Sequence, residues 1–292
     1  MPELPEVECV RLSLERLVVG RTIQAVRVTR PDVITGPADH AALLAGDKVS
    51  KVIRHGKQLA LLGRGGGCVC VHLGMSGQFC VVTGEYAGTP NMKRSSTPNG
   101  SQRKADLPPH THVLWEFDDG QAVRFTDPRR FGGLWTFGCE EALIARRWSA
   151  LGPDALCITP GQMSAGLSRT RRGLKAAILD QHLVAGLGNI YVDELLFNAK
   201  LHPLLPADDL DPKHVPGLVK RMKTLLRGAI ERGGSTLRDY VDAENRRGSQ
   251  QDRHRVYGRS GQGCKRRGCG GTIRSEQVAG RTTAWCPRCQ KL

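Results

Sequence analysis

The chain lacks any long hydrophobic run. No stretch approaches the ~18 consecutive apolar residues of a candidate membrane span, and the N-terminus has no basic segment followed by an apolar run. A secretory signal would need that order of basic and apolar segments. These absences argue against the usual membrane and secreted classes, and we expect an intracellular protein that does not bind a membrane.

Acidic residues are scarce relative to basic ones. The sequence has 28 Asp and Glu against 43 Lys and Arg, which leaves a formal net charge of +15. This surplus attracts polyanions, so nucleic acid is the first partner to consider, although a solvated basic surface explains the charge equally well. At 292 residues the chain has room for two ordinary domains and a small appendage.

The first half of the chain predicts one helix followed by strands. Val7, Val10 and Leu14 recur at helical spacing, and Gly20 follows as a stop. Short β-prone runs then alternate with turn signals such as the DDG at 118–120, which favours a β-sandwich over alternating βα units. The expected strands are residues 22–28, 57–62, 68–73, 112–117, 121–126 and 133–137.

From about residue 140 the pattern becomes helical. The expected helices are EEALIARRWSAL, GLKAAILDQHLV, GNIYVDELLFNAK and VPGLVKRMKTLLRGAIERGG. The predicted parts of the chain are an N-terminal β-sandwich (1–137) with a polar surface insertion (83–109), a linker (138–150), a helical domain (151–241), a charged loop (242–257) and a C-terminal ribbon (258–292).

Four of the ten cysteines gather near the C-terminus as Cys-x4-Cys, sixteen residues, then Cys-x2-Cys. A plausible β-hairpin between the pairs lets four thiolates meet around one Zn²⁺, and no position is left for water, so the zinc is expected to be structural. The predicted ligands are Cys264, Cys269, Cys286 and Cys289. The six scattered cysteines are expected to be small core residues: Cys9, Cys68, Cys70, Cys80, Cys139 and Cys157.

The N-terminal Pro2 and Glu3 have two interpretations. Once Met1 is removed, Pro2 carries a secondary α-amine, which titrates near ~8 and is a nucleophile at neutral pH. Its attack on a sugar C1′ gives a cationic iminium, and Glu3 can protonate the sugar oxygen as the ring opens. The alternative is that Pro2 merely starts a helix and Glu3 complements the helix dipole, and these two residues alone favour it.

A glycine-rich turn at 186–189 separates two apolar-faced helices. Its backbone amides, at the N-terminus of the second helix, can bind a phosphate with help from Asn189. Basic Arg171 and Lys175 lie nearby in the sequence and favour that interpretation. The alternative is an ordinary interhelical turn, which is the commoner role of such a sequence.

Taken together, several motifs resemble the formamidopyrimidine-DNA glycosylase family. They occur in the order of that family and cover essentially the whole chain apart from the insertion. The resemblance implies an α+β multidomain fold: an N-terminal β-sandwich with flanking helices, a helix-two-turn-helix domain and a zinc-binding β-hairpin, with DNA in the basic cleft between them. The motifs are PELPEVE, HLGMSG at 72–77, DPRRFGG at 127–133, DQHLVAGLGNIYVDELLF and the cysteine ribbon ending CPRCQK.

The resemblance implies a base-excision repair glycosylase and AP lyase that removes oxidised purines, such as 8-oxoguanine and formamidopyrimidines, from damaged duplex DNA and then cleaves the strand by β,δ-elimination. It also implies a monomer in the cytoplasm or nucleoid of a bacterium. By similarity, Pro2 is the Schiff-base nucleophile and Glu3 the general acid, with Glu6 nearby. Lys57 and Arg281 match the family's catalytic lysine and the arginine of the later elimination.

The same resemblance assigns residues to DNA binding. Met75, Arg129 and Phe131 match the trio that fills the gap left by a flipped nucleotide. Without the resemblance, core packing would be the preferred explanation for Met75 and Phe131, and a surface ion pair for Arg129. Further DNA contacts are expected at His72, His110, Arg171, Lys175 and Asn189.

The chain departs from the family pattern in three places. The first cysteine pair is separated by four residues rather than two, the insertion is longer, and the loop expected to cap the lesion, 242–257, lacks an aromatic residue over 242–255. Two other functions remain open at this point. One is an endonuclease VIII-like glycosylase for oxidised pyrimidines, and the other is a non-catalytic zinc-ribbon protein that binds DNA.

Overall fold

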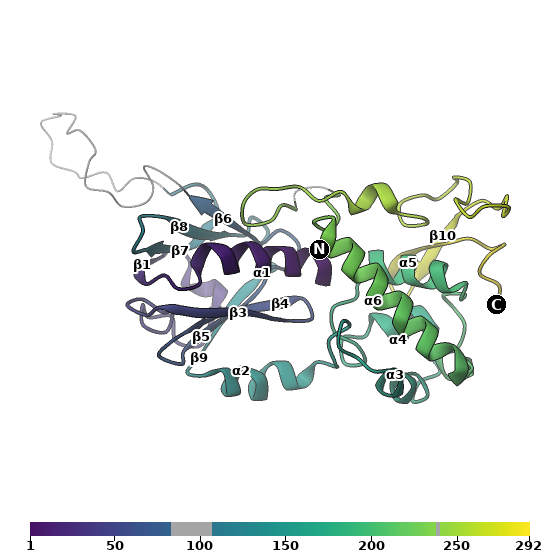
Figure 1. The fold of residues 1–292 in the computed structure, drawn as a ribbon, viewed down its shortest axis with the longest axis horizontal. Coiled ribbons are helices and arrows are strands. Elements are labelled where there is room, and N and C mark those ends of the chain that lie inside the picture. The colour runs from purple at the N-terminus through teal and green to yellow at the C-terminus, as the bar shows by residue number, and fades with distance from the viewer. Residues whose placement is uncertain (83–106, 238–239) are drawn as a thin grey trace, which may run out of the picture.

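The structure is a computed structural model that describes residues 1–82, 107–237 and 240–292. Most of the insertion expected at 83–109 therefore lies outside the described residues. Figure 1 shows a β-rich part on one side and a helical part with a β-hairpin on the other. In the described part of the chain, no helix is both long and apolar enough to cross a membrane.

Helix α1 (Leu4–Val18) opens the chain, as predicted. Its apolar face is buried within the β-rich part, and the helix also contacts strand β3 (Val49–His55) and helix α6 (Val215–Glu231). Glu3 is the N-cap residue, and Pro5 is the proline in the first turn. Pro2 therefore precedes the helix, and the alternative in which it serves as a first-turn residue is wrong.

Two sheets form the sandwich, and their facing sides enclose an apolar core. The five-stranded sheet has the order β2 (Ile34–Thr35), β9 (Gly133–Phe137), β5 (Cys68–His72), β4 (Gln58–Gly63) and β3 (Val49–His55). The four-stranded sheet has the order β1 (Ile23–Val28), β7 (Thr111–Phe117), β8 (Ala122–Thr126) and β6 (Gln78–Val82). The predicted β-sandwich is confirmed, but the sequence did not predict β2, β3 and β6.

Residues 138–150, expected as a linker, carry helix α2 (Glu140–Arg146). Leu143 of this helix and Trp148 after it are buried against side chains of β4 and β5. Because it buries apolar surface there, this segment is part of the sandwich and not a free connection.

The helical part contains four α-helices among its described residues. They are α3 (Pro160–Leu167), α4 (Leu174–Leu179), α5 (Asn189–Ala199) and α6 (Val215–Glu231), and they share one apolar core. Helix α3 was not predicted, because it is short and contains Gly161 and Gly166. The predicted helix GLKAAILDQHLV ends at Leu179, where the chain turns toward the glycine-rich segment.

The C-terminal ribbon contains the expected hairpin, made of β10 (Arg274–Val278) and β11 (Arg281–Trp285). A small apolar cluster that includes Phe197 of α5 joins the ribbon to the helical part. Of the six scattered cysteines, four are buried as expected, but Cys139 is half-buried and Cys157 is exposed. The core expectation is wrong for these two. The Cys139 sulfur accepts a hydrogen bond from the Ala142 amide (3.4 Å) and so caps α2.

Candidate active site and nucleic-acid interface

Glu3 binds the N-terminus of α5. Its buried carboxylate accepts hydrogen bonds from the backbone amides of Gly188 (2.7 Å), Ile190 (2.8 Å) and Tyr191 (3.3 Å). A Cβ atom on Gly188 would lie 2.5 Å from the Glu3 carboxyl carbon, so only glycine permits this approach. Amides at a helix N-terminus stabilise an anion, and here that anion is Glu3. The phosphate expected at this turn is therefore replaced by a carboxylate of the chain itself.

Glu6 lies beside Glu3 and is also fully enclosed. Its carboxylate accepts hydrogen bonds from the Glu3 amide (2.9 Å), the Tyr191 hydroxyl (2.6 Å) and the Ser235 amide (2.7 Å). Burial and the neighbouring charge of Glu3 raise the pKa of Glu6 to about 7. Glu6 can therefore gain or lose a proton near neutral pH. Neither Tyr191 nor Ser235 was singled out from the sequence, although Tyr191 lies inside the longest family motif.

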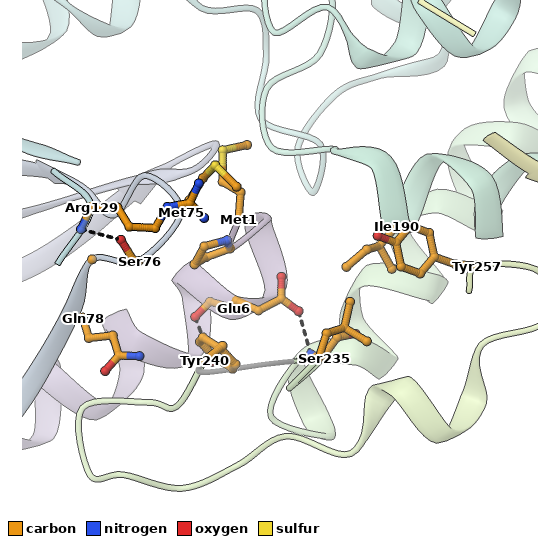
Figure 2. Close-up of a pocket in the computed structure, with 13 residues that line it drawn as sticks. Met1, Glu6, Met75, Ser76, Gln78, Arg129, Ile190, Ser235, Tyr240 and Tyr257 are labelled. Atoms are coloured by element: carbon orange, nitrogen blue, oxygen red, sulfur yellow. Dashed lines mark hydrogen bonds between the residues drawn. The ribbon is translucent and has the colours of Figure 1, made fainter. Parts of the chain in front are cut away.

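A pocket of about 320 Å³ has Pro2 among its lining residues. Figure 2 shows it with Met1, Glu6 and Arg129 around it. Met1 also lines this pocket, and burial lowers the pKa of its terminal amino group. The pocket is bounded by the start of α1, the turn after β5, the segment after β8 and the chain around Ser235. Its lining residues are Met1, Pro2, Glu6, Met75, Ser76, Gly77, Gln78, Arg129, Ile190, Ser235, Leu237, Tyr240 and Tyr257.

Two of these lining residues, Tyr240 and Tyr257, lie on either side of the aromatic-free stretch 242–255, and Tyr257 is the last residue of the loop expected to cap a lesion. The structure therefore brings an aromatic residue from each side of that stretch to the pocket. Tyr240 also donates a hydrogen bond from its hydroxyl to the Glu6 carbonyl (3.1 Å), which fixes its ring beside α1.

Lys57 and Arg281 approach the same place from two other elements. Lys57 is buried at the turn between β3 and β4, and burial lowers the pKa of its ammonium group. The charge of Glu3 opposes that shift and the charge of Arg281 reinforces it, so both charges act on Lys57. Among the described residues the Lys57 ammonium has no ion-pair partner. Gly56 permits this turn, with φ of 57° and a Cβ position 2.9 Å from Ala185.

Lys175, expected to contact DNA, is buried with 0% of its surface exposed. Its ammonium pairs with Asp193 (2.7 Å) and donates to the Thr282 carbonyl (3.3 Å). Asp193 in turn accepts from the Ala284 amide (2.9 Å), and the Asn189 side chain donates to Thr282 (2.8 Å). These contacts attach β11 to α4 and α5, so Lys175 holds the strand that begins with Arg281 and does not face solvent.

Met75 and Phe131 project into solvent, 47% and 55% exposed. The Arg129 guanidinium lies 4.7 Å from the centroid of the Phe131 ring, a cation–π contact. Core packing therefore does not explain the two apolar residues. Arg129 also has no acidic partner among the described residues, which excludes the ion-pair alternative there.

The two turns that carry these side chains are fixed by backbone contacts. Asp127 accepts hydrogen bonds from the Ser76 hydroxyl and from the Gly132 amide (2.7 Å). Gly74 has φ of 61°, and a Cβ there would lie 2.3 Å from the Phe131 carbonyl carbon. Glycine is therefore required where the HLGMSG turn meets the DPRRFGG turn.

The remaining expected DNA contacts lie outside the pocket lining. His72 ends β5, and burial lowers its pKa to about 4, so it is neutral at physiological pH. His110 is exposed with φ of 63°. Arg171 is 90% exposed and lies 3.6 Å from Asp208.

The four C-terminal cysteines meet as expected. Their sulfur atoms all lie within 4.8 Å of one another, with separations of 3.9 Å for Cys264 and Cys289, 3.6 Å for Cys269 and Cys286, and 3.3 Å for Cys269 and Cys289. A tetrahedral Zn²⁺ with Zn–S bonds of about 2.3 Å places its sulfurs about 3.8 Å apart. The thiolates thus fit one structural zinc ion, and the four-residue spacing of the first pair does not prevent it.

Comparison with known families assigns all three parts of the chain. Residues 1–134 match the formamidopyrimidine-DNA glycosylase N-terminal domain, residues 151–241 match the H2TH domain of the same enzymes, and residues 261–292 match the zinc finger found in FPG and IleRS. The formamidopyrimidine-DNA glycosylase of Geobacillus kaustophilus is 40% identical over 297 residues, and that of Cereibacter sphaeroides is 40% identical over 294 residues. Each alignment covers 100% of both chains.

Solved structures that resemble this chain come from the same family. The MutM (Fpg) protein from Thermus thermophilus is 35% identical, with a TM-score of 0.81 over 99% of this chain and 98% of that one. A Lactococcus lactis Fpg mutant in complex with DNA containing Fapy-dG is 31% identical, with a TM-score of 0.83 over 100% of both chains.

A sandwich, an H2TH domain and a zinc finger in one chain define a DNA glycosylase of base-excision repair. The chain belongs to the formamidopyrimidine-DNA glycosylase family. It is a DNA-binding repair enzyme with AP lyase activity that carries one zinc ion, and its relatives named above come from bacteria.

Proposed function

We propose that this enzyme removes oxidised purines, 8-oxoguanine and formamidopyrimidines, through a Schiff base on Pro2 and then cleaves the strand by β,δ-elimination. The observation that carries the proposal is that Pro2 and the buried Glu6 line one pocket. Glu3 is buried beside Glu6, and the charges of Glu3 and Arg281 both act on the buried Lys57. Two related proteins support the choice of lesion. One was solved with DNA containing Fapy-dG and another, 31% identical, with DNA containing carbocyclic 8-oxo-G.

The chemistry begins at Pro2 after removal of Met1. The amine lone pair forms a bond to C1′ as the glycosidic bond breaks, and the departing base leaves with both electrons of that bond and takes a proton from water. The Glu3 carboxylate takes the proton of the new ammonium and gives it to O4′, and the bond between C1′ and O4′ opens to leave a cationic iminium.

The iminium then drives strand cleavage. It withdraws electrons from C1′, so a C2′ proton becomes acidic and the 3′-phosphate leaves by β-elimination, followed by the 5′-phosphate by δ-elimination. We place Lys57 and Arg281 beside the phosphates because both are cationic, and none of the described acidic side chains neutralises them by an ion pair.

Access to the base requires its extrusion from the duplex, which costs a few kcal/mol of stacking and pairing. We propose that Met75 and Phe131 fill the gap and that Arg129 faces the orphaned base, which their exposure permits. The extruded base would enter the pocket, with loop 242–257 closing over it. His72, His110, Arg171 and Asn189 are proposed to contact the DNA backbone. Lys175 acts differently, by holding β11.

The proposed place of action is the cytoplasm and nucleoid of a bacterium. The named relatives are bacterial, and the ten free cysteines suit a reducing compartment. In the proposed division of labour, residues 1–137 form the catalytic domain, residues 151–241 form the DNA-binding domain, and residues 258–292 form the zinc hairpin that supplies Arg281.

Borohydride trapping tests the proposal. Wild-type enzyme is incubated with duplexes containing 8-oxoguanine or thymine glycol and reduced, and the adduct is digested and sequenced. We expect a covalent adduct at Pro2 that forms faster on 8-oxoguanine. Faster trapping on thymine glycol would favour an endonuclease VIII-like specificity, and absence of any adduct on either duplex would favour a non-catalytic DNA-binding protein.

A further inference from the structure

A second pocket lies at the zinc site, away from the lesion pocket. It has a volume of about 570 Å³. Its lining contains five cationic side chains and no acidic one: Lys200, Arg266, Arg267, Arg288 and Lys291, together with Gly268, Cys269, Pro287 and Cys289. We call this the knuckle pocket.

The cations of the knuckle pocket are not neutralised by neighbouring side chains. None of the five forms an ion pair with an acidic side chain of the described residues. Four thiolates and one Zn²⁺ carry a net charge of −2, which offsets two of the five positive charges. An excess of positive charge therefore remains in a concave site, and such a site raises the local concentration of anions.

The enlarged first knuckle builds this pocket. Four residues separate Cys264 from Cys269, and three of them, Arg266, Arg267 and Gly268, line the pocket. Phe197 fixes the position of the Arg266 side chain. The Arg266 guanidinium donates a hydrogen bond to the Phe197 carbonyl (2.5 Å) and lies 4.6 Å from the Phe197 ring centroid. The Arg267 side chain is exposed and has no partner among the described residues, so it is free to meet a ligand.

Helix α5 separates the knuckle pocket from the catalytic groups. Asn189 begins this helix beside Glu3, and Lys200 is the residue that ends it. At 1.5 Å per residue, the two ends of this 11-residue helix lie roughly 16 Å apart. Figure 1 places the hairpin and the C-terminus at the end of the molecule away from the sandwich. A duplex held at the lesion pocket therefore need not occupy the knuckle pocket.

We propose that the knuckle pocket binds phosphodiester groups of a second DNA segment, so that the enzyme can contact two segments at once and transfer directly from one to the other. Three arginines favour phosphate oxygens, because the guanidinium fork matches their geometry. DNA is also the polyanion on which this enzyme works, so a second segment is always close by.

A competitor-dependent dissociation experiment tests this proposal. Enzyme is bound to a fluorescent duplex that contains a tetrahydrofuran abasic analogue and is mixed with rising concentrations of an undamaged, unlabelled duplex. In wild type we expect the dissociation rate to rise with competitor concentration, because the second duplex binds before the first leaves. Arg267→Glu with Lys291→Glu should lower that slope by about fivefold or more, since the charge that attracts the second duplex is reversed.

A matched variant separates the pocket from general charge. Arg64→Glu with Arg146→Glu changes the net charge equally at exposed positions of the sandwich part and should leave the slope as in wild type. Zinc content should equal wild type in both variants. A wild-type rate independent of competitor would overturn the proposal, as would an equal loss in both variants. Binding of a polyglutamate peptide that depends on Arg267 and Lys291, with no change in the DNA-dependent slope, would show that the pocket takes an acidic protein and not DNA.

Discussion

The buried carboxylates and the exposed side chains of the site are held in opposite ways. Glu3 and Glu6 receive hydrogen bonds from the start of α5, from Tyr191 and from Ser235, and both are almost wholly enclosed. Met75 and Phe131 stand in solvent, although the backbone turns beneath them are tightly fixed. The side chains that we propose to transfer protons are thus fixed by the fold, whereas those that we propose to act as a wedge are exposed.

The difference follows from what each group must do. A group that transfers a proton needs its position fixed before the substrate arrives, and the buried amide donors fix the position of the Glu3 carboxylate. A wedge gains its energy from contacts with DNA, so its apolar surface has to remain uncovered until then. Exposed apolar side chains next to a rigid turn are the expected form of such a group.

The largest effect is expected from blocking the Pro2 amine. Adding one residue ahead of Pro2 turns its nitrogen into an amide, which has no nucleophilic lone pair. We expect a loss of the borohydride-trapped adduct of at least about a thousandfold, with DNA binding preserved. Unchanged trapping would show that another amine is the nucleophile.

The next largest effect is expected for Glu3→Gln. Gln keeps the shape but has no proton to give, so excision of 8-oxoguanine should fall by about 10² to 10⁴. Cleavage at a pre-formed abasic site should survive, because that sugar already equilibrates with an open aldehyde. Single-turnover rates on the two substrates make the comparison, and parallel losses on both would point to a structural role at the start of α1.

Zinc removal tests whether DNA binding depends on the folded ribbon. Cys286→Ser should lose the metal and unfold residues 258–292, because four thiolates supply most of the stability of so short a segment. DNA affinity should fall by roughly a hundredfold as cationic contacts are lost. Metal analysis and fluorescence anisotropy measure the two effects. Full affinity in a zinc-free protein would contradict this prediction.

The carboxylate pair also predicts a pH dependence of stability. The pKa of Glu6 is raised from 4.5 to about 7, so between these values the folded protein keeps a proton that the unfolded chain has released. Stability from this group is full below pH 4.5 and is lost as the pH rises through 7, by up to ~3 kcal/mol. Glu6→Gln should remove that slope from the free energy of unfolding.

The comparison between wild type and Glu6→Gln isolates Glu6, because other buried acids are present in both proteins. The pKa of Asp193 is raised to about 6 and that of Glu194 is also raised, and each contributes a slope of the same sign. Denaturant titrations at several pH values measure the difference. An identical slope in the two proteins would mean that Glu6 stays ionised.

Much of the fold was predictable because its signals are local. Alternating apolar residues and turn signals predicted the sandwich, and cysteine spacing predicted the zinc site. Strand β3 escaped detection for a physical reason: a bulge between Val49 and Lys51 breaks the two-residue alternation on which strand prediction depends.

The site was less predictable, because its contacts join distant parts of the chain. Gly188 lies 185 positions from Glu3, and the role of its amide follows only from the folded chain. Lys175 shows the converse. A lysine near a glycine-rich turn suggests a phosphate contact, but the buried Asp193 on a neighbouring helix turns the ammonium inward. Residue type and spacing indicate which chemistry is available, and tertiary contacts decide which group performs it.

The exposed part of the site gives the smallest predicted effect. Phe131→Ala removes a ring that is 55% exposed, so the folded protein loses little and its melting temperature should change little. Excision of a lesion paired in a duplex should fall by about tenfold, because less of the cost of extrusion is recovered, whereas cleavage at an abasic site needs no base to be extruded. The ratio of the two single-turnover rates is therefore the decisive measurement. Ile144→Ala, at an apolar residue of α2 that is 46% exposed and lies outside the pocket lining, controls for the loss of apolar surface. If Phe131→Ala lowers both rates equally, the Phe131 ring supports the structure of the site and does not assist extrusion of the base. The proposed difference between the buried carboxylates and the exposed wedge residues would then be wrong for Phe131.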